Sequence, residues 1–136
     1  MLDLPINECL DEIVDAVRDD IPVVLKAPPG AGKTTGVPPA LLQAGVADAG
    51  QIILVQPRRL AARTAASRVA KLVGAKLGED VGYHVRFDRK ATQSTRVIVM
   101  TTGILLRRLN SDPLLEDVAC VILDEFHERS LEMDLA

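Results

Sequence analysis

The sequence has very few aromatic residues: there is no tryptophan, one tyrosine and two phenylalanines in 136 residues. A wide platform for stacked nucleic-acid bases is therefore not expected. Apolar residues nevertheless make up 48% of the chain, which is enough to bury the core of one ordinary domain. That core must be built mainly from Val, Ile, Leu and Ala.

Cysteine is also scarce, and no apolar run approaches the length that a bilayer span needs. Cys9 and Cys120 lack the close pairing typical of zinc or redox sites. We interpret both as buried small apolar side chains, rather than as metal ligands or a disulfide, in a reducing compartment. The first residues also lack the basic start and apolar stretch of a signal peptide. These absences predict a soluble, cytoplasmic protein that has no membrane partner.

Positive charge is concentrated in the middle of the chain, although the net charge is −3. Residues 57–108, the basic block, contain twelve Lys or Arg against three Asp or Glu, whereas residues 109–136 are strongly acidic. A polyanionic partner would explain the basic block, since clustered positive charge releases counterions from a phosphate backbone. Solvated helix faces would explain it equally well, and charge alone leaves both interpretations open.

Apolar runs and helical patterns alternate along the chain. Strands are predicted at residues 23–25, 51–55, 96–100 and 118–123, and helices at 33–43, 60–73 and 103–109. The apolar runs are unbroken, as expected for strands that are covered on both faces. This order predicts an α/β fold in three layers, with a mainly parallel sheet between helices.

Three further features modify this pattern. An amphipathic helix capped by Asn7 is expected near the start, where apolar residues recur at helical spacing, at Ile6, Leu10, Ile13, Val14 and Val17. Residues 81–87 are predicted to form an additional strand, which leads through a polar segment into the strand at 96–100 as a hairpin-like excursion. Pro38 and Pro39 are expected to kink the helix at 33–43 or to displace its start.

A phosphate-binding loop is predicted after the first strand, in the segment Ala27-Pro28-Pro29-Gly30-Ala31-Gly32-Lys33-Thr34-Thr35. Gly30 and Gly32 allow backbone N–H groups to wrap closely around a phosphate, and the helix N-terminus behind them adds positive potential. Lys33 would then reach the β- and γ-phosphates, the Thr34 hydroxyl would hold magnesium and Thr35 would touch the α-phosphate. The first position of the usual pattern is alanine rather than glycine. An ordinary Gly-Pro turn is the alternative.

Two adjacent carboxylates follow the last predicted strand, in the run Val121-Ile122-Leu123-Asp124-Glu125-Phe126-His127-Glu128-Arg129-Ser130. Magnesium bound to a nucleotide needs a carboxylate on a neighbouring strand end, and hydrolysis needs a group that orients water. Asp124 and Glu125 fit these two roles. A surface Asp-Glu pair is one alternative, and a metal hydrolase that also uses His127 and Glu128 is another, although no second ligand cluster supports it.

With both sites placed, the chain resembles the first RecA-like domain of superfamily 2 DEAH-box RNA helicases, and most closely the HrpB-like group. Three more segments carry the resemblance in the family's order, namely Gln56-Pro57-Arg58-Arg59-Leu60-Ala61-Ala62, Val81-Gly82-Tyr83-His84-Val85-Arg86-Phe87 and Thr101-Thr102-Gly103-Ile104-Leu105. Phe126 replaces the alanine for which the family is named, as HrpB-like members tolerate. Thr102 stands where these helicases commonly carry an acidic residue.

The resemblance implies roles for several residues of the basic block. Arg58, Arg59 and the segment Thr101-Thr102-Gly103 would contact the backbone of single-stranded RNA. Arg86 is similar to the family's hook-shaped turn that borders the RNA path. Arg68 is similar to the arginine that stacks on adenine, and an exposed helix arginine is the alternative.

The implied activity is ATP-dependent RNA unwinding, with ATP and Mg²⁺ as ligands and Lys33, Asp124, Glu125 and His127 as the catalytic set. Glu125 would orient the attacking water, and His127 would couple the nucleotide site to later motifs. Residues 1–136 would be the N-terminal part of the first domain, an incomplete RecA-like P-loop NTPase domain. We expect the second RecA-like domain to be absent and turnover by this chain to be very slow. Another P-loop NTPase or kinase, or a nucleic-acid-binding module without turnover, stays open as an alternative.

Overall fold

The computed structural model describes residues 23–27, 31–48 and 50–124. In this part of the chain six strands form one sheet in the order β1-β6-β2-β5-β3-β4. The strands are β1 Val23–Ala27, β2 Gln51–Gln56, β3 Val81–Val85, β4 Asp88–Lys90, β5 Val97–Thr101 and β6 Val118–Asp124. The helices are α2 Ala31–Gln43, α3 Arg59–Val73 and α4 Thr102–Ser111, with a short 3-10 helix, η1, at Val46–Asp48. The helix predicted near the start and Cys9 lie outside the described residues.

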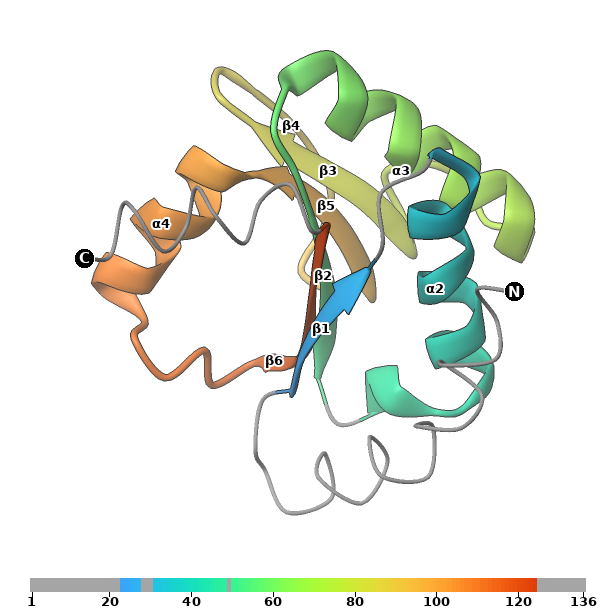
Figure 1. Ribbon diagram of the computed structural model, residues 1–136, viewed down its shortest axis with the longest axis horizontal. Coiled ribbons are helices and arrows are strands. Elements are labelled where there is room, and N and C mark those ends of the chain that lie inside the picture. The colour runs from blue at the N-terminus through green and yellow to red at the C-terminus, as the bar shows by residue number, and fades with distance from the viewer. Residues whose placement is uncertain (1–22, 28–30, 49, 125–136) are drawn as a thin grey trace.

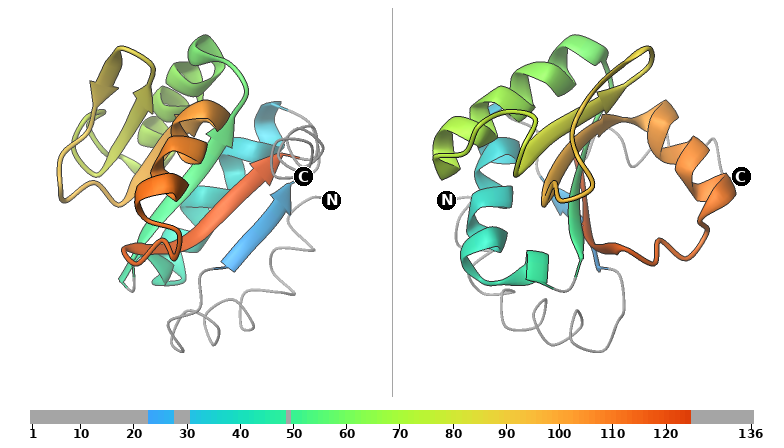
Figure 2. Two further views of the ribbon diagram at one scale, coloured as in Figure 1. Left: turned by 90° about the vertical axis from the view of Figure 1, so that its left-hand side faces the viewer. Right: turned by 180° about the vertical axis from the view of Figure 1, so that it is seen from behind.

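Five strands of the sheet run parallel, and only the edge strand β4 is antiparallel to its neighbour β3. Helices α2 and α3 cover one face of the sheet and α4 covers part of the other (Figures 1 and 2). The α/β class, the mainly parallel sheet and the three layers predicted from the sequence are therefore confirmed.

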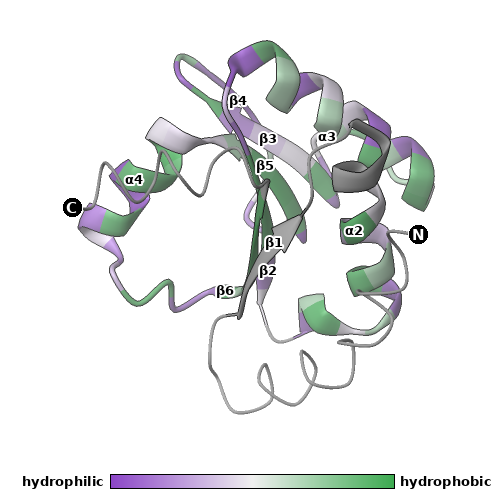
Figure 3. Cartoon of the chain, in the orientation of Figure 1, coloured by the Kyte–Doolittle hydropathy of each residue, from purple (hydrophilic) through white to green (hydrophobic). Residues whose placement is uncertain are grey.

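The two faces of the sheet are buried in separate hydrophobic clusters. In β2, Ile52 and Leu54 belong to the cluster under α2 and α3, whereas Ile53 and Val55 belong to the cluster under α4. All four side chains are fully buried, and hydrophobic residues follow one another along the central strands (Figure 3). Covering on both faces is why these strands read as unbroken apolar runs in the sequence.

Helix α2 begins at Ala31 and contains both Pro38 and Pro39. Of the two expected effects of the prolines, displacement of the helix start is therefore wrong, and the kink stays a prediction. Proline lacks a backbone N–H, so each removes one helical hydrogen bond, but Pro38 is buried in the packed protein. Tertiary packing of the helix outweighs this local cost, because most of the stability of a helix in a protein comes from such packing.

The predicted strand at residues 81–87 ends earlier, at Val85, and returns as β4. The hairpin-like excursion is confirmed, but the strand is shorter because Phe87 has a φ angle of 68°, in the left-handed region. Extended backbone cannot continue through such a residue. The β3–β4 turn therefore presents Arg86 and Phe87 at its tip.

Cys120 lies in β6 and is fully buried. Its burial raises the pKa of the thiol to about 12, so the side chain is a neutral, small apolar group at physiological pH. This confirms the interpretation of Cys120. Separately, none of the helices in the described ranges is long and apolar enough to cross a membrane.

Gly82 holds β3 close to the strand that returns beside it. A Cβ atom at this position would lie inside the contact distance of the Lys90 carbonyl oxygen and 2.9 Å from the Cβ of Ala91. We expect Gly82→Ala to lower the free energy of unfolding by about 1–3 kcal/mol, as overpacking does, in a urea titration. Gly103→Ala is the control, because a Cβ atom there meets nothing within 4 Å. Equal stability of the two variants would show that the hairpin does not require the glycine.

Candidate functional site

Motifs that are far apart in the sequence lie along one edge of the sheet, where the carboxyl ends of the parallel strands meet. Ala27 at the end of β1 is paired in register with Asp124 at the end of β6. Gln56 at the end of β2 is paired with Thr101 at the end of β5. Ligands of open parallel sheets bind in crevices outside this edge. We call it the carboxyl edge.

The first part of the carboxyl edge combines the phosphate-loop segment with the acidic strand end. Five residues of that segment form the start of α2, namely Ala31, Gly32, Lys33, Thr34 and Thr35. The first turn of α2 contains no acidic residue, so no carboxylate of its own offsets the positive potential of the helix N-terminus. Neighbouring strands lie about 4.8 Å apart, so the register pairing of Ala27 with Asp124 brings the backbone of the two motifs together.

The structure does not test the predicted roles of four site residues. Gly30, Glu125 and His127 lie outside the described residues. Arg68 is exposed on α3, nine residues beyond Arg59 and hence about 14 Å further along the helix at 1.5 Å per residue. The predicted roles of these four residues stay predictions.

The second part of the carboxyl edge contains a surface pocket of about 500 Å³, which we call the edge pocket. It is lined by Pro57, Arg59, Arg86, Thr101, Gly103, Ile104 and Arg107. Residues from the ends of β2, β3 and β5 therefore meet here, as the resemblance implied for the RNA path. Arg58 occupies the N-cap position of α3 and is exposed, between the lining residues Pro57 and Arg59 in the sequence. Thr102 is the first residue of α4.

Three arginines of the edge pocket come from three different parts of the fold, and none of its lining residues that the structure describes is acidic. The Nη1 atom of Arg59 donates to the carbonyl oxygen of Arg86 at 3.4 Å. The guanidinium carbon of Arg86 lies 4.8 Å from the centre of the Phe87 ring, a cation–π contact that holds Arg86 at the hairpin tip. The pocket is therefore a preformed cationic surface.

Arg107 was not predicted from the sequence as a site residue. It follows Gly103 by four residues on α4, and residues four apart on a helix lie on the same face. This spacing in the sequence indicates that Arg107 lies on the same face of α4 as Gly103, next to the segment Thr101-Thr102-Gly103.

Helices α3 and α4 also begin at this edge, and neither has a side chain in its own first turn that offsets the positive potential of its N-terminus. The residues before the first turns, Arg58 for α3 and Thr101 for α4, have extended backbones and make no side-chain capping hydrogen bond. Neither first turn contains an acidic residue. Backbone N–H groups at helix starts attract anions, so both ends favour phosphate groups at this edge.

A polar contact fixes the β3–β4 hairpin against α3. The Tyr83 hydroxyl donates to Oδ2 of Asp88 at 2.9 Å, and the Arg63 Nε atom lies 3.8 Å from the same oxygen. Burial, and then the hydrogen bond and negative charge of Asp88, raise the pKa of Tyr83. The phenol therefore stays a neutral donor, and the hairpin presents Arg86 from a supported position.

Metal ligands form no cluster in the part of the chain that the structure describes, where no group of three His, Cys, Asp or Glu side chains could hold an ion. Glu125, His127 and Glu128, which the metal-hydrolase interpretation uses, lie outside the described residues, so this alternative is not tested. The magnesium ligands implied by the sequence, Thr34 and Asp124, belong to the first part of the carboxyl edge.

Comparison with known proteins matches this chain to one family. The sequence pattern of "DEAD/DEAH box helicase" matches residues 7–134. The chain is 48% identical over 136 residues to "ATP-dependent RNA helicase HrpB" of Escherichia coli, covering all of this chain and 17% of that protein. It is 40% identical over 131 residues to "ATP-dependent RNA helicase HrpA" of Borreliella burgdorferi, covering 96% of this chain and 16% of that protein.

A solved structure is similar in fold as well. The crystal structure of the E. coli DExH-box NTPase HrpB superimposes with a TM-score of 0.71 at 46% sequence identity, covering 97% of this chain and 16% of that one. The chain thus spans about a sixth of the length of these relatives.

Proposed function

The chain belongs to the DEAD/DEAH box helicase family, and from that premise we propose that it is the ATP-binding part of an ATP-dependent RNA helicase. The observation that carries the proposal is the division of one sheet edge into two adjacent parts. One part joins the phosphate-loop segment to Asp124, and the other is the edge pocket with its three arginines. In this proposal residues 1–136 form the N-terminal part of the first RecA-like domain, in a cytoplasmic protein.

Nucleotide binding is assigned to the first part. The backbone of residues 30–32 and the start of α2 bind the phosphates, Lys33 neutralises the β- and γ-phosphates and Thr35 contacts the α-phosphate. A hydroxyl and a carboxylate are the oxygen ligands that Mg²⁺ prefers, so Thr34 and Asp124 fit as its protein ligands. Bound there, Mg²⁺ would neutralise charge on the phosphates.

Hydrolysis is assigned to the residues that follow β6. Glu125 directly succeeds Asp124, so it can orient a water molecule toward the γ-phosphate for in-line attack. His127 then couples this site to RNA-dependent movements. Arg68 contacts the adenine ring from α3.

RNA binding is assigned to the edge pocket and its surroundings. Arg59, Arg86 and Arg107 supply positive charge, and Arg58, Thr101, Thr102 and Gly103 lie beside the helix starts that favour phosphate groups. Contacts of this kind position a nucleic-acid backbone without reading its bases. Binding should therefore be largely independent of sequence and steeply dependent on salt.

Replacing Arg59 and Arg86 together with glutamine should weaken binding of single-stranded RNA. Each lost phosphate contact reduces the slope of log K against log salt by about 0.7 on a single strand, so the double variant should lose about 1.4 from that slope. Fluorescence anisotropy with oligouridine and oligoadenosine, at several salt concentrations, measures both quantities. The affinity should fall by a similar factor for the two RNAs.

The matched control is Arg96→Gln combined with Lys71→Gln, which removes two exposed positive charges that do not line the edge pocket. This control should retain most of the affinity and the salt slope. An equal loss in both double variants would mean that overall charge, rather than the edge pocket, binds RNA.

A further inference from the structure

A second basic pocket, the α4 pocket, lies between the sheet and α4. Its volume is about 330 Å³, within the range of about 300–1,000 Å³ that is typical of small-ligand sites. It is lined by Gln51, His84, Arg89, Ile98, Met100, Ile104, Arg107, Arg108 and Ser111. Gln51 is the first residue of β2 and Ser111 the last of α4, so this pocket extends away from the carboxyl edge along the sheet.

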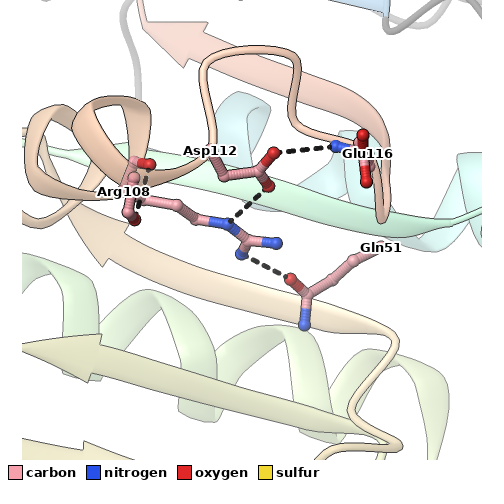
Figure 4. Close-up of polar contacts among 5 residues, drawn as sticks. Gln51, Arg108, Asp112 and Glu116 are labelled. Carbon is pink, nitrogen blue, oxygen red and sulfur yellow. Dashed lines mark hydrogen bonds and ion pairs between the residues drawn. The ribbon is translucent and has the colours of Figure 1, made fainter.

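Three of the lining residues are arginines, and within the described ranges none is acidic. Arg108 is already engaged: its Nη1 atom donates to Oε1 of Gln51 at 3.1 Å, and its Nε atom lies 3.9 Å from Oδ2 of Asp112 (Figure 4). Arg89 and Arg107 have no hydrogen bond or ion pair to any other residue that the structure describes. Two guanidinium groups therefore border the pocket without a counter-charge from this part of the chain.

His84 on β3 lies next to the same arginines, and its pKa responds to their positive charge. It is half-buried, and its pKa is lowered first by burial and then by the charges of Arg89, Arg107 and Arg108. These charges come from β4 and α4, and the carboxylate of Asp112 is engaged by Arg108. The imidazole is therefore neutral near pH 7, and the pocket holds uncompensated positive charge next to it.

We propose that the α4 pocket binds a small anion that carries a phosphate group. The guanidinium group matches the geometry of phosphate oxygens with paired N–H donors, and Arg89 and Arg107 are available for this contact. The Gln51 and Ser111 side chains are already hydrogen-bonded within the protein, so the two arginines are the donors for the anion. Ile98, Met100 and Ile104 provide an apolar wall against which a sugar or base can pack. A nucleoside monophosphate or inorganic phosphate fits this chemistry. The α4 pocket shares Ile104 and Arg107 with the edge pocket, and its described lining includes no residue of the phosphate-loop segment.

The test uses the imidazole of His84 as a local reporter. The ¹H–¹³C NMR signals of its ring, assigned by their loss in His84→Asn, are followed while inorganic phosphate, pyrophosphate or AMP is added at constant ionic strength. We expect a saturable shift of the ring signals. We also expect a higher pKa of His84 in the saturated protein, because a bound anion offsets the arginine charges. Tighter binding of AMP than of inorganic phosphate identifies a nucleotide site, and equal binding identifies a site for the phosphate group alone.

Variants separate this pocket from the proposed nucleotide site. Arg89→Gln combined with Arg107→Gln should weaken the interaction reported by His84 at least about tenfold, which corresponds to about 1.4 kcal/mol. Lys71→Gln, which removes one charge from α3, should leave it unchanged, and so should Lys33→Ala. A ¹H–¹⁵N spectrum of each variant verifies that it is folded. The proposal is overturned if no anion shifts the His84 signals in a saturable way, if the double arginine variant binds as tightly as Lys71→Gln, or if Lys33→Ala abolishes the response.

Discussion

Lys33→Ala is expected to lower the affinity of the protein for Mg-ATP by about 100-fold, or about 2.7 kcal/mol. Under the proposed function, the Lys33 ammonium group is the main positive side chain at the β- and γ-phosphates. Its removal leaves phosphate charge without a partner, and such contacts to charged groups are individually strong. Titration calorimetry of ATP into the two proteins, with saturating magnesium, measures the difference directly.

Lys71→Ala is the control for the loss of one lysine charge. Lys71 lies in the last turn of α3, away from the phosphate-loop segment in the sequence and on a different helix. Its replacement should leave the affinity for ATP within about twofold of the original value, since surface substitutions away from special features have small effects. If Lys33→Ala bound ATP as tightly as Lys71→Ala, the segment at residues 27–35 would not be a phosphate-binding loop.

Glu125→Gln is expected to reduce the rate of ATP hydrolysis by about 100-fold or more while it preserves ATP affinity. Glutamine has nearly the same shape as glutamate but is a much weaker base, and positioned general bases contribute about 10²–10⁴-fold to such reactions. Release of radiolabelled phosphate from γ-labelled ATP, with protein in excess, quantifies even slow turnover. Calorimetry on the same sample measures the affinity.

The comparison variant for this prediction is Glu79→Gln, which makes the same chemical change at an exposed position between α3 and β3. It should hydrolyse ATP at the original rate. Equal rates for Glu125→Gln and Glu79→Gln would rule out Glu125 as the residue that orients water. A loss of ATP affinity in Glu125→Gln would instead assign that carboxylate to binding.

Much of the fold could be predicted because the strands are covered on both faces. The runs around Ile52 and Val121 are apolar at every position, and each became a central strand. The end of β3 could not be predicted, since the left-handed backbone of Phe87 depends on the tight turn that joins β3 to β4. A helix through Pro38 was predicted, but its start at Ala31 was not, because local propensity argues against an undisturbed helix there and tertiary packing decides it.

The candidate site was predictable as motifs but not as a surface. The chemistry of Lys33 and Asp124 follows from their residue types and neighbours, yet the register that pairs the two strand ends comes from the parallel β1–β6 contact. Periodicity alone does not determine which strands are neighbours. Arg107 and Arg89 were not predicted as site residues, because the sequence does not show which elements are neighbours. Their importance depends on a pocket that β3, β4, β5 and α4 build together.

Under the proposed function, one sheet edge carries two adjacent and distinct sites, one for ATP and one for RNA. The most direct test of this claim is a titration of Mg-ATP and single-stranded RNA, each in the presence and absence of the other, into the original protein, Lys33→Ala and the Arg59→Gln/Arg86→Gln double variant. We predict that the original protein binds both ligands at once, that Lys33→Ala loses only ATP and that the double arginine variant loses only RNA. Displacement of ATP by RNA in the original protein, or loss of both ligands in either variant, would contradict the claim.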